Sequence, residues 1–166
     1  MIQKMLSKWY YADGAIRWID APCTKTSSAG DPVPHFEKKS GHRVVSFWHN
    51  GKTHKLQYGR VVWLLVHGEF PLEEIDHIDR NPANNRIENL RIADRCQNNW
   101  NRALTATMGV HKHGPSWRAE VVARKRKHRV NGFCTKEAAV EFRDLMVDML
   151  HGEFANRMLC ASAFKG

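Results

Sequence analysis

The chain has 166 residues, of which 26 are Lys or Arg and 17 are Asp or Glu, so its formal net charge is +9. This length allows one ordinary domain or two small ones, and a hydrophobic content of 42% excludes a disordered polycation. No apolar run reaches the roughly 18 residues of a membrane span, so we expect no membrane association and an intracellular location. The positive excess makes a polyanion, with nucleic acid first, the expected partner.

The cysteines are scattered along the chain without a CxxC pair, which predicts free thiols in a reducing compartment and no structural zinc. They are Cys23, Cys96, Cys134 and Cys160.

The charges are distributed unevenly. Residues 69–94 contain seven acidic and three basic side chains, net −4, whereas residues 109–131 contain seven basic and one acidic, net +6. An acidic island inside a basic protein suggests a site for a divalent cation, and solvated surface charge is the alternative interpretation.

The N-terminal part predicts two hairpins, one turning at Asp13-Gly14 and one at Asn50-Gly51, because these dipeptides favour two-residue turns between strands. Residues 60–67 are apolar and end at Gly68, which predicts a short buried helix, with a strand as the alternative.

Residues 74–103 predict the order strand, loop, strand, helix. The strands cover residues 74–78 and 90–93, and the turn-rich loop covers 79–86. Asp94 is a predicted N-cap, with Gln97 three residues later as in a capping box, for a helix that runs to about residue 103.

The C-terminal part predicts a linker over 104–108 and strands over 109–113, 117–124 and 128–133. A helix from Thr135 to about residue 151 follows. Its apolar spacing predicts one core-facing stripe, and Trp117 is expected in the same core. The predicted stripe is Ala138, Phe142, Leu145 and Met149.

The predicted fold class is therefore α+β. An N-terminal lobe of hairpins and the strand–loop–strand–helix pattern covers residues 1–105, and a three-stranded antiparallel sheet packed on one helix covers 106–166.

Asp76 and His77 are adjacent at the end of a predicted strand, so their side chains point to opposite faces. A carboxylate can bind a hard cation, and an imidazole can take a proton from water. Phosphodiester hydrolysis uses both functions, and Asn98 in the first turn of the next helix could complete a metal site. The alternative is a polar turn whose side chains only cap backbone groups.

Residues 75–79 (Ile-Asp-His-Ile-Asp), 84–91 and 97–99 resemble the HNH endonucleases. They are most similar to phage-encoded and homing members with the ββα-metal motif. The spacing that carries this resemblance is His77, Asn89 twelve residues on, and Asn98 nine residues further.

The resemblance implies that His77 is the general base. Asn89 would brace the loop and keep His77 oriented. Asp76 and Asn98 would ligate one Mg²⁺ (or Mn²⁺) ion per active site. The implied activity is metal-dependent cleavage of double-stranded DNA, as a nick or a double-strand break, by a free-standing homing endonuclease. A phage-encoded protein of this kind would act in the cytoplasm of a bacterial host, as a monomer or a homodimer.

Several alternatives stay open at this point. Arg86 and Arg91 could contact phosphate or form ion pairs on the loop. The chain could be a DNA-binding regulator with an inactive nuclease lobe, or its partner could be RNA.

The basic run 124–129 lies between two predicted strands, at a sheet edge suited to phosphate binding. Around it, Gly109-Val110, residues 117–121, Gly132-Phe133, Thr135 and residues 137–139 resemble the plant ethylene-response-factor (apetala-type) DNA-binding domain. A sheet of this kind can enter the major groove, where arginine reads guanine edges. We expect base contacts from Arg118 and Arg124. The expected phosphate contacts are Lys112, Lys125, Arg126, Lys127 and Arg129.

Overall fold

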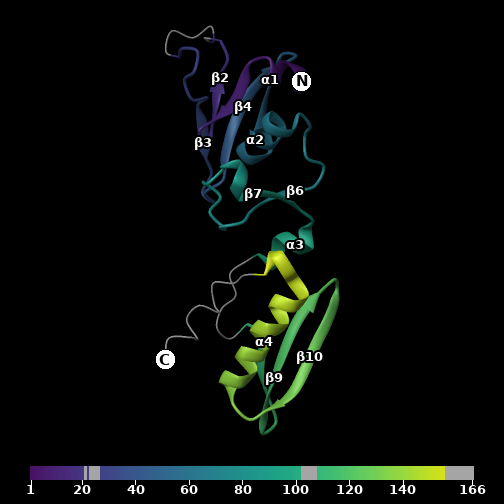
Figure 1. The fold of residues 1–166 in the computed structure, drawn as a ribbon. Helices are drawn as coiled ribbons and strands as arrows, with labels where there is room; N and C mark the ends of the chain where they lie inside the picture. Colours follow the sequence, from purple (N-terminus) through teal and green to yellow (C-terminus); the bar gives the residue numbers. More distant parts are fainter. Residues whose placement is uncertain (21, 23–26, 102–107, 156–166) are drawn as a thin grey trace. The chain divides into compact units, whose positions relative to one another are not determined.

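The computed structural model describes residues 1–20, 22, 27–101 and 108–155. Within it the chain forms two compact units, Met1–Ala93 and Asp94–Gly166 (Figure 1). The predicted linker 104–108 lies almost entirely outside the described residues, and the domain boundary between residues 105 and 106 remains a prediction. Among the described residues, no helix is long and apolar enough to cross a membrane.

Both predicted hairpins of the first unit are confirmed. Strand β1 (Trp9–Ala12) pairs with β2 (Ala15–Trp18), and β4 (Arg43–His49) pairs with β5 (Lys52–Gln57). The turn residues Asn50 and Gly51 have φ of 50° and 75°, the left-handed pair that a two-residue hairpin turn requires. Two short elements were not predicted, helix α1 (Ile2–Leu6) and strand β3 (His35–Glu37), which adds a third strand to β4.

Helix α2 (Tyr58–His67) confirms the predicted buried helix, and Gly68 ends it in the left-handed conformation at φ 79°. It packs on β1, β4 and β5 around a core in which Trp9 makes edge-on contacts with Trp18 and Phe47. The fully buried members of this core include Met5, Trp9, Ile16, Val45, Val61, Val62 and Leu64.

The predicted strand–loop–strand pattern is also observed. Strand β6 (Glu74–His77) pairs antiparallel with β7 (Leu90–Ala93), and the short 3₁₀ helix η1 (Ile87–Asn89) leads into β7. In this register Asp76 lies opposite Arg91.

The second unit begins with helix α3 (Arg95–Trp100), whose capping box between Asp94 and Gln97 is confirmed. The structure describes the helix as far as its C-cap Asn101, and the predicted end near residue 103 lies outside the described residues.

A three-stranded antiparallel sheet follows in the order β10-β9-β8. Its strands are β8 (Val110–His113), β9 (Ser116–Ala123) and β10 (Arg126–Phe133). Helix α4 (Lys136–His151) packs against this sheet, mainly on β9, and η2 (Gly152–Phe154) follows it (Figure 1). Thr135 caps α4 as predicted, because its hydroxyl accepts a hydrogen bond from the amide of Ala138.

The predicted core face of α4 is wrong. Leu145 and Met149 are 60% and 84% exposed, and Ala138 and Phe142 are only half-buried. The buried face lies one to two positions further along the helix, a rotation of about 150°, and consists of Ala139, Arg143, Val147 and His151. This face is polar at two of its four positions, so apolar spacing alone selected the neighbouring stripe.

The middle strand of the sheet alternates as predicted, with Ala119, Val121 and Ala123 buried. Trp117 is half-buried, beside Lys136 at the start of α4. Cys96 and Cys134 are free thiols as expected, whereas Cys23 and Cys160 lie outside the described residues.

Candidate active site

Asp76 is a buried carboxylate, only 5% exposed, near the end of β6. Its Oδ2 accepts hydrogen bonds from Arg91 Nε at 2.9 Å and Nη2 at 2.8 Å. The guanidinium reaches across the β6–β7 pair because the two residues are directly opposite in register. Of the two alternatives for Arg91, the structure shows the ion pair.

His77 is held by an asparagine that the sequence reading did not single out. Asn85 is 4% exposed, and its Nδ2 donates to the carbonyl oxygens of Pro82 and Ala83, which turns its Oδ1 toward His77 Nε2 at 3.2 Å. Since an amide oxygen only accepts, we assign the imidazole proton to Nε2, and Nδ1 is then the nitrogen that can receive a proton.

The imidazole of His77 is adapted to act as a base at neutral pH. Burial lowers its pKa below the ordinary value of 6.5, the hydrogen bond that the ring donates to Asn85 opposes this shift, and nearby His42 adds to it. His42 lies edge-on to His77 with the ring centres 5.9 Å apart. The ring is therefore neutral at pH 7 and able to accept a proton.

Helix α2 passes close to the Asn85 amide at Gly59, where the lack of a side chain leaves room for it. A Cβ atom at Gly59 would lie 3.0 Å from Asn85 Oδ1, so a larger residue at this buried position would displace the amide that contacts His77. The sequence carries no local signal for this contact, because Gly59 and Asn85 are 26 residues apart.

The loop between β6 and β7 is held by its own side chains. Asn89 Oδ1 accepts from the amide of Asp79 at 3.0 Å, and its Nδ2 donates to Asp79 Oδ1 at 2.9 Å and to the carbonyl of Asn84 at 2.8 Å. Burial opposes ionisation of Asp79, but hydrogen bonds from Asn84, the Asn81 backbone and Asn89 outweigh it and lower the pKa of Asp79. Asn89 thus lies where it can brace the loop, and Asn85 is the residue bonded to the His77 ring.

Asn98 lies half-buried in the first turn of α3, in the second unit. One carboxylate and one amide oxygen form a donor set that suits a hard cation such as Mg²⁺. Among the described residues, no group of three or more His, Cys, Asp or Glu side chains is arranged to hold a metal ion. Joint ligation by Asp76 and Asn98 therefore stays a prediction.

Arg86 and the two cations of the β9–β10 turn are exposed, whereas Arg91 is largely covered in its ion pair with Asp76. Arg86 is exposed on the loop, with its side chain beside Gly14. Arg124 and Lys125 form the turn between β9 and β10 at φ 48° and 64°, so Arg124 does not continue the strand as predicted. The turn instead presents both cations at the tip of the hairpin.

The outer face of the C-terminal sheet carries paired charges. Arg129 Nε lies 2.6 Å from Glu120 Oε2 and Lys127 Nζ lies 3.7 Å from Glu120 Oε1, and this pairing lowers the pKa of Glu120. Arg118 Nε donates to Asn131 Oδ1 at 2.6 Å.

The two other predicted phosphate contacts, Lys112 and Arg126, are exposed, but they do not lie on the outer face with Arg118, Lys127 and Arg129. Strand alternation and cross-strand register place Arg126 opposite Ala123 and Lys112 opposite Trp117, on the face of the sheet that α4 covers.

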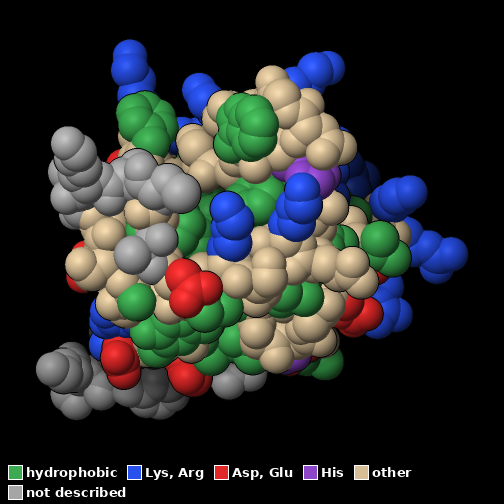
Figure 2. Space-filling model, turned by 90° about the horizontal axis from the view of Figure 1, so that it is seen from above, with side chains coloured by type: hydrophobic (Ala, Val, Ile, Leu, Met, Phe, Trp, Pro, Cys, Tyr) green, Lys and Arg blue, Asp and Glu red, His purple; other side chains and the backbone are tan. Residues whose placement is uncertain are grey.

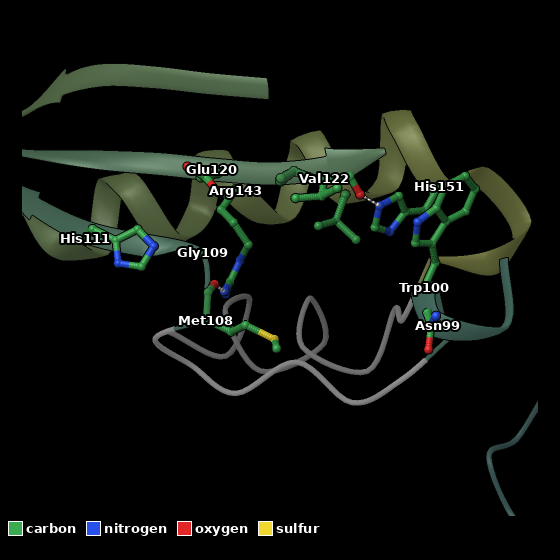
Figure 3. Close-up of a pocket in the computed structure, with 11 residues that line it drawn as sticks. Asn99, Trp100, Met108, Gly109, His111, Glu120, Val122, Arg143 and His151 are labelled. Atoms are coloured by element: carbon green, nitrogen blue, oxygen red, sulfur yellow. Dashed lines mark hydrogen bonds between the residues drawn. The ribbon is translucent and has the colours of Figure 1, made fainter. Parts of the chain in front are cut away.

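A separate pocket of about 330 Å³ lies within the second unit (Figure 3). The Trp100 indole stacks on the His151 imidazole with ring centres 4.5 Å apart and an interplanar angle of 2°. His151 Nε2 lies 3.2 Å from the carbonyl oxygen of Val122, and burial lowers the pKa of His151. Buried Arg143 donates to the carbonyl of Met108 and pairs with Asp144. The lining contains none of the residues predicted to bind metal or DNA.

Comparison with known proteins finds a family match over the segment that contains Asp76 and His77. Residues 59–100, which include β6, the loop, β7 and α3, match the family model of HNH endonucleases. An uncharacterized HNH endonuclease of Acanthamoeba polyphaga mimivirus is 35% identical over 105 residues, which cover 61% of this chain and 56% of that protein. Protein 3.8 of Escherichia phage T7 is 32% identical over 102 residues, which cover 57% of this chain and 84% of that protein. No solved structure matches significantly.

Residues 59–100 therefore form an HNH endonuclease domain, and the chain has viral relatives, one of them an HNH endonuclease. The chain spans about half the length of the mimivirus relative.

Proposed function

We propose that the protein is a metal-dependent endonuclease that hydrolyses phosphodiester bonds in double-stranded DNA. The observation that carries this proposal is the half-buried His77, neutral at pH 7 and oriented by Asn85, inside the segment that matches the HNH family. The net charge of +9 supports a polyanionic substrate.

In this proposal His77 Nδ1 takes a proton from the attacking water, while the bond from Nε2 to Asn85 keeps the ring fixed. Asp76 and Asn98 are the proposed ligands of one Mg²⁺ or Mn²⁺ ion, which when bound supplies charge neutralisation at the scissile phosphate. Arg91 orients the Asp76 carboxylate through two hydrogen bonds to a single oxygen. Asn89 keeps the loop in shape.

We further propose that the C-terminal sheet is an apetala-type DNA-binding module that directs cleavage. Its hairpin tip, Arg124 and Lys125, is exposed and cationic. Arg118 and Arg124 are the proposed base contacts, and the remaining basic side chains of the module position the backbone. A free-standing homing role in a phage-infected cell extends the same proposal.

Nicking of supercoiled plasmid in Mg²⁺, with EDTA as the metal-free control, tests the nuclease. The wild type should nick, and His77→Ala should lower the rate by roughly 10²–10⁴-fold, the usual contribution of a positioned base. His67→Ala is the matched control, because His67 is an exposed histidine at the end of α2, outside the site. Equal activity of wild type and His77→Ala with each metal would contradict the proposal and favour a DNA-binding regulator.

Asn85→Ala separates orientation from binding. It should lower kcat while DNA affinity, measured in EDTA, stays at the wild-type value, because Asn85 touches the His77 ring. Competition between duplex DNA and structured RNA tests the substrate, and an RNA preference would overturn the choice of DNA.

A further inference from the structure

The sheet β3-β4-β5 has one face that its own core does not use. In β4, Val45 and Phe47 point into the core and are 0% and 4% exposed, so the alternate residues point the other way. On that outward side, Trp48 of β4 and Phe36 of β3 are each 69% exposed. Two large aromatic rings on the outer face of one sheet call for a ligand that can cover them.

The cross-strand register places Lys55 of β5 on the same face, at a level along the strands between those of Trp48 on β4 and Phe36 on β3. Ser46 pairs with Lys55, two residues along β4 from Trp48, and Val44 pairs with Phe36, two residues further. At about 3.3 Å per residue, the three side chains are spread over about 13 Å along the strand direction, on three neighbouring strands.

The surroundings of this face are strongly basic. Residues 35–57 contain five Lys or Arg and one Glu, net +4 with histidine neutral. Figure 2 shows Lys and Arg side chains standing beside exposed hydrophobic side chains on one face of the molecule. A second copy of the chain is disfavoured here, because it would bring two positive faces together.

We infer that this outer face, defined by Phe36, Trp48 and Lys55, is a second nucleic-acid site and that it binds unpaired DNA. Nucleobases supply the π-faces that Trp and Phe stack on, and the phosphates between them supply the negative charge for lysine. In a duplex the base faces are covered by neighbouring bases, so exposed rings find them only in an unpaired strand. The inference rests on the proposed function in the choice of DNA as the polyanion.

The test uses the full chain in EDTA with a labelled single-stranded oligonucleotide and fluorescence anisotropy. Trp48→Ala and Phe36→Ala should each weaken binding by roughly 5–150-fold, the value of one stacked base. Trp48→Tyr should restore most of the affinity. Lys55→Ala should reduce the salt slope by about 0.7, the single-strand value for one phosphate contact. Leu72→Ala is the matched control, because Leu72 is 100% exposed and is not part of the face.

The proposed function assigns duplex binding to the C-terminal sheet, to which Trp48 does not belong. Duplex affinity should therefore change less than about twofold, or about 0.4 kcal/mol, in Trp48→Ala. Unchanged single-strand binding by Trp48→Ala and Phe36→Ala with native circular dichroism would overturn the inference. An equal loss on duplex DNA, or Trp48-dependent binding to phosphatidylserine vesicles without an effect on the oligonucleotide, would also overturn it. A chain that binds single strands through Trp48 but does not nick plasmid would refute the nuclease and leave this site standing.

Discussion

The turn between β9 and β10 offers a sharp test of how the C-terminal module divides stability from binding. Arg124 and Lys125 both adopt positive φ, 48° and 64°, in a position where most hairpins place Asn and Gly. The same chain uses Asn50-Gly51 at nearly the same dihedral angles, 50° and 75°. The perturbation is the double replacement of Arg124→Asn and Lys125→Gly.

The expected gain in stability follows from the backbone. A residue other than Gly in the left-handed region costs about 1–2 kcal/mol, and Asn tolerates it better than Arg. Glycine offsets about 0.4–1 kcal/mol of this through the greater freedom of the unfolded chain. The net gain should be about 1 kcal/mol, which corresponds to about 4–8 °C in Tm for a domain of 60–100 residues.

DNA binding should change in the opposite direction. Each lost phosphate contact lowers the slope of log affinity against log salt concentration by about 0.9 on duplex DNA. Urea unfolding followed by circular dichroism, and anisotropy titrations at several NaCl concentrations, measure the two effects on one variant. The reciprocal control, Asn50→Arg with Gly51→Lys, should destabilise the first unit through the left-handed backbone of this turn. No atom lies within 4 Å of a Cβ at Gly51, so a steric clash makes no contribution to the cost.

A replaced turn that is no more stable than wild type would refute the strain argument. A replaced turn that binds DNA with unchanged affinity and salt slope would refute the role of the hairpin tip.

The remaining predictions concern three buried features. Lowering the pH below 6.5 should lower the stability of the second unit, because folding depresses the pKa of His151 and the unfolded chain then binds the extra proton; His151→Gln should flatten this dependence in urea unfolding at pH 5.5 and 7.5. Gly109→Ala should cost more than about 1 kcal/mol, because the new Cβ at φ 75° would clash with the carbonyl oxygen of Glu120, and an unchanged urea midpoint would contradict that clash. Arg91→Ala should cost about 3–5 kcal/mol by removing the partner of a buried carboxylate, whereas Arg91→Ala with Asp76→Asn should recover part of the loss.

Local sequence signals predicted most elements of the fold. The Asp13-Gly14 and Asn50-Gly51 turns, the Gly68 helix end and the Asp94 capping box each depend on a few neighbouring residues. Short patterns of this kind are complete in the sequence, so their structures follow from it. The same is true of Asp76 and His77. The turn-rich residues that follow them predict the strand end, and strand alternation predicts that their side chains point to opposite faces.

Features that depend on distant partners were not predicted. The buried face of α4 includes Arg143, whose burial depends on the carbonyl of Met108, 35 residues away. The short strand β3 exists because β4 pairs with it. Asn85 reads as one more polar loop residue until Gly59 of α2 is seen to leave space for its amide. Tertiary contacts decide these cases, and no local pattern encodes them.

The loop between β6 and β7 carries its scaffold within itself. The side-chain hydrogen bonds of Asp79, Asn84, Asn85 and Asn89 all have partners inside residues 77–89. A segment of this kind can keep its shape when the surrounding core changes in sequence, because its hydrogen bonds lie within the segment itself. Insertions elsewhere in such a chain would leave the histidine and its asparagine in register during divergence, provided that a glycine stays at position 59.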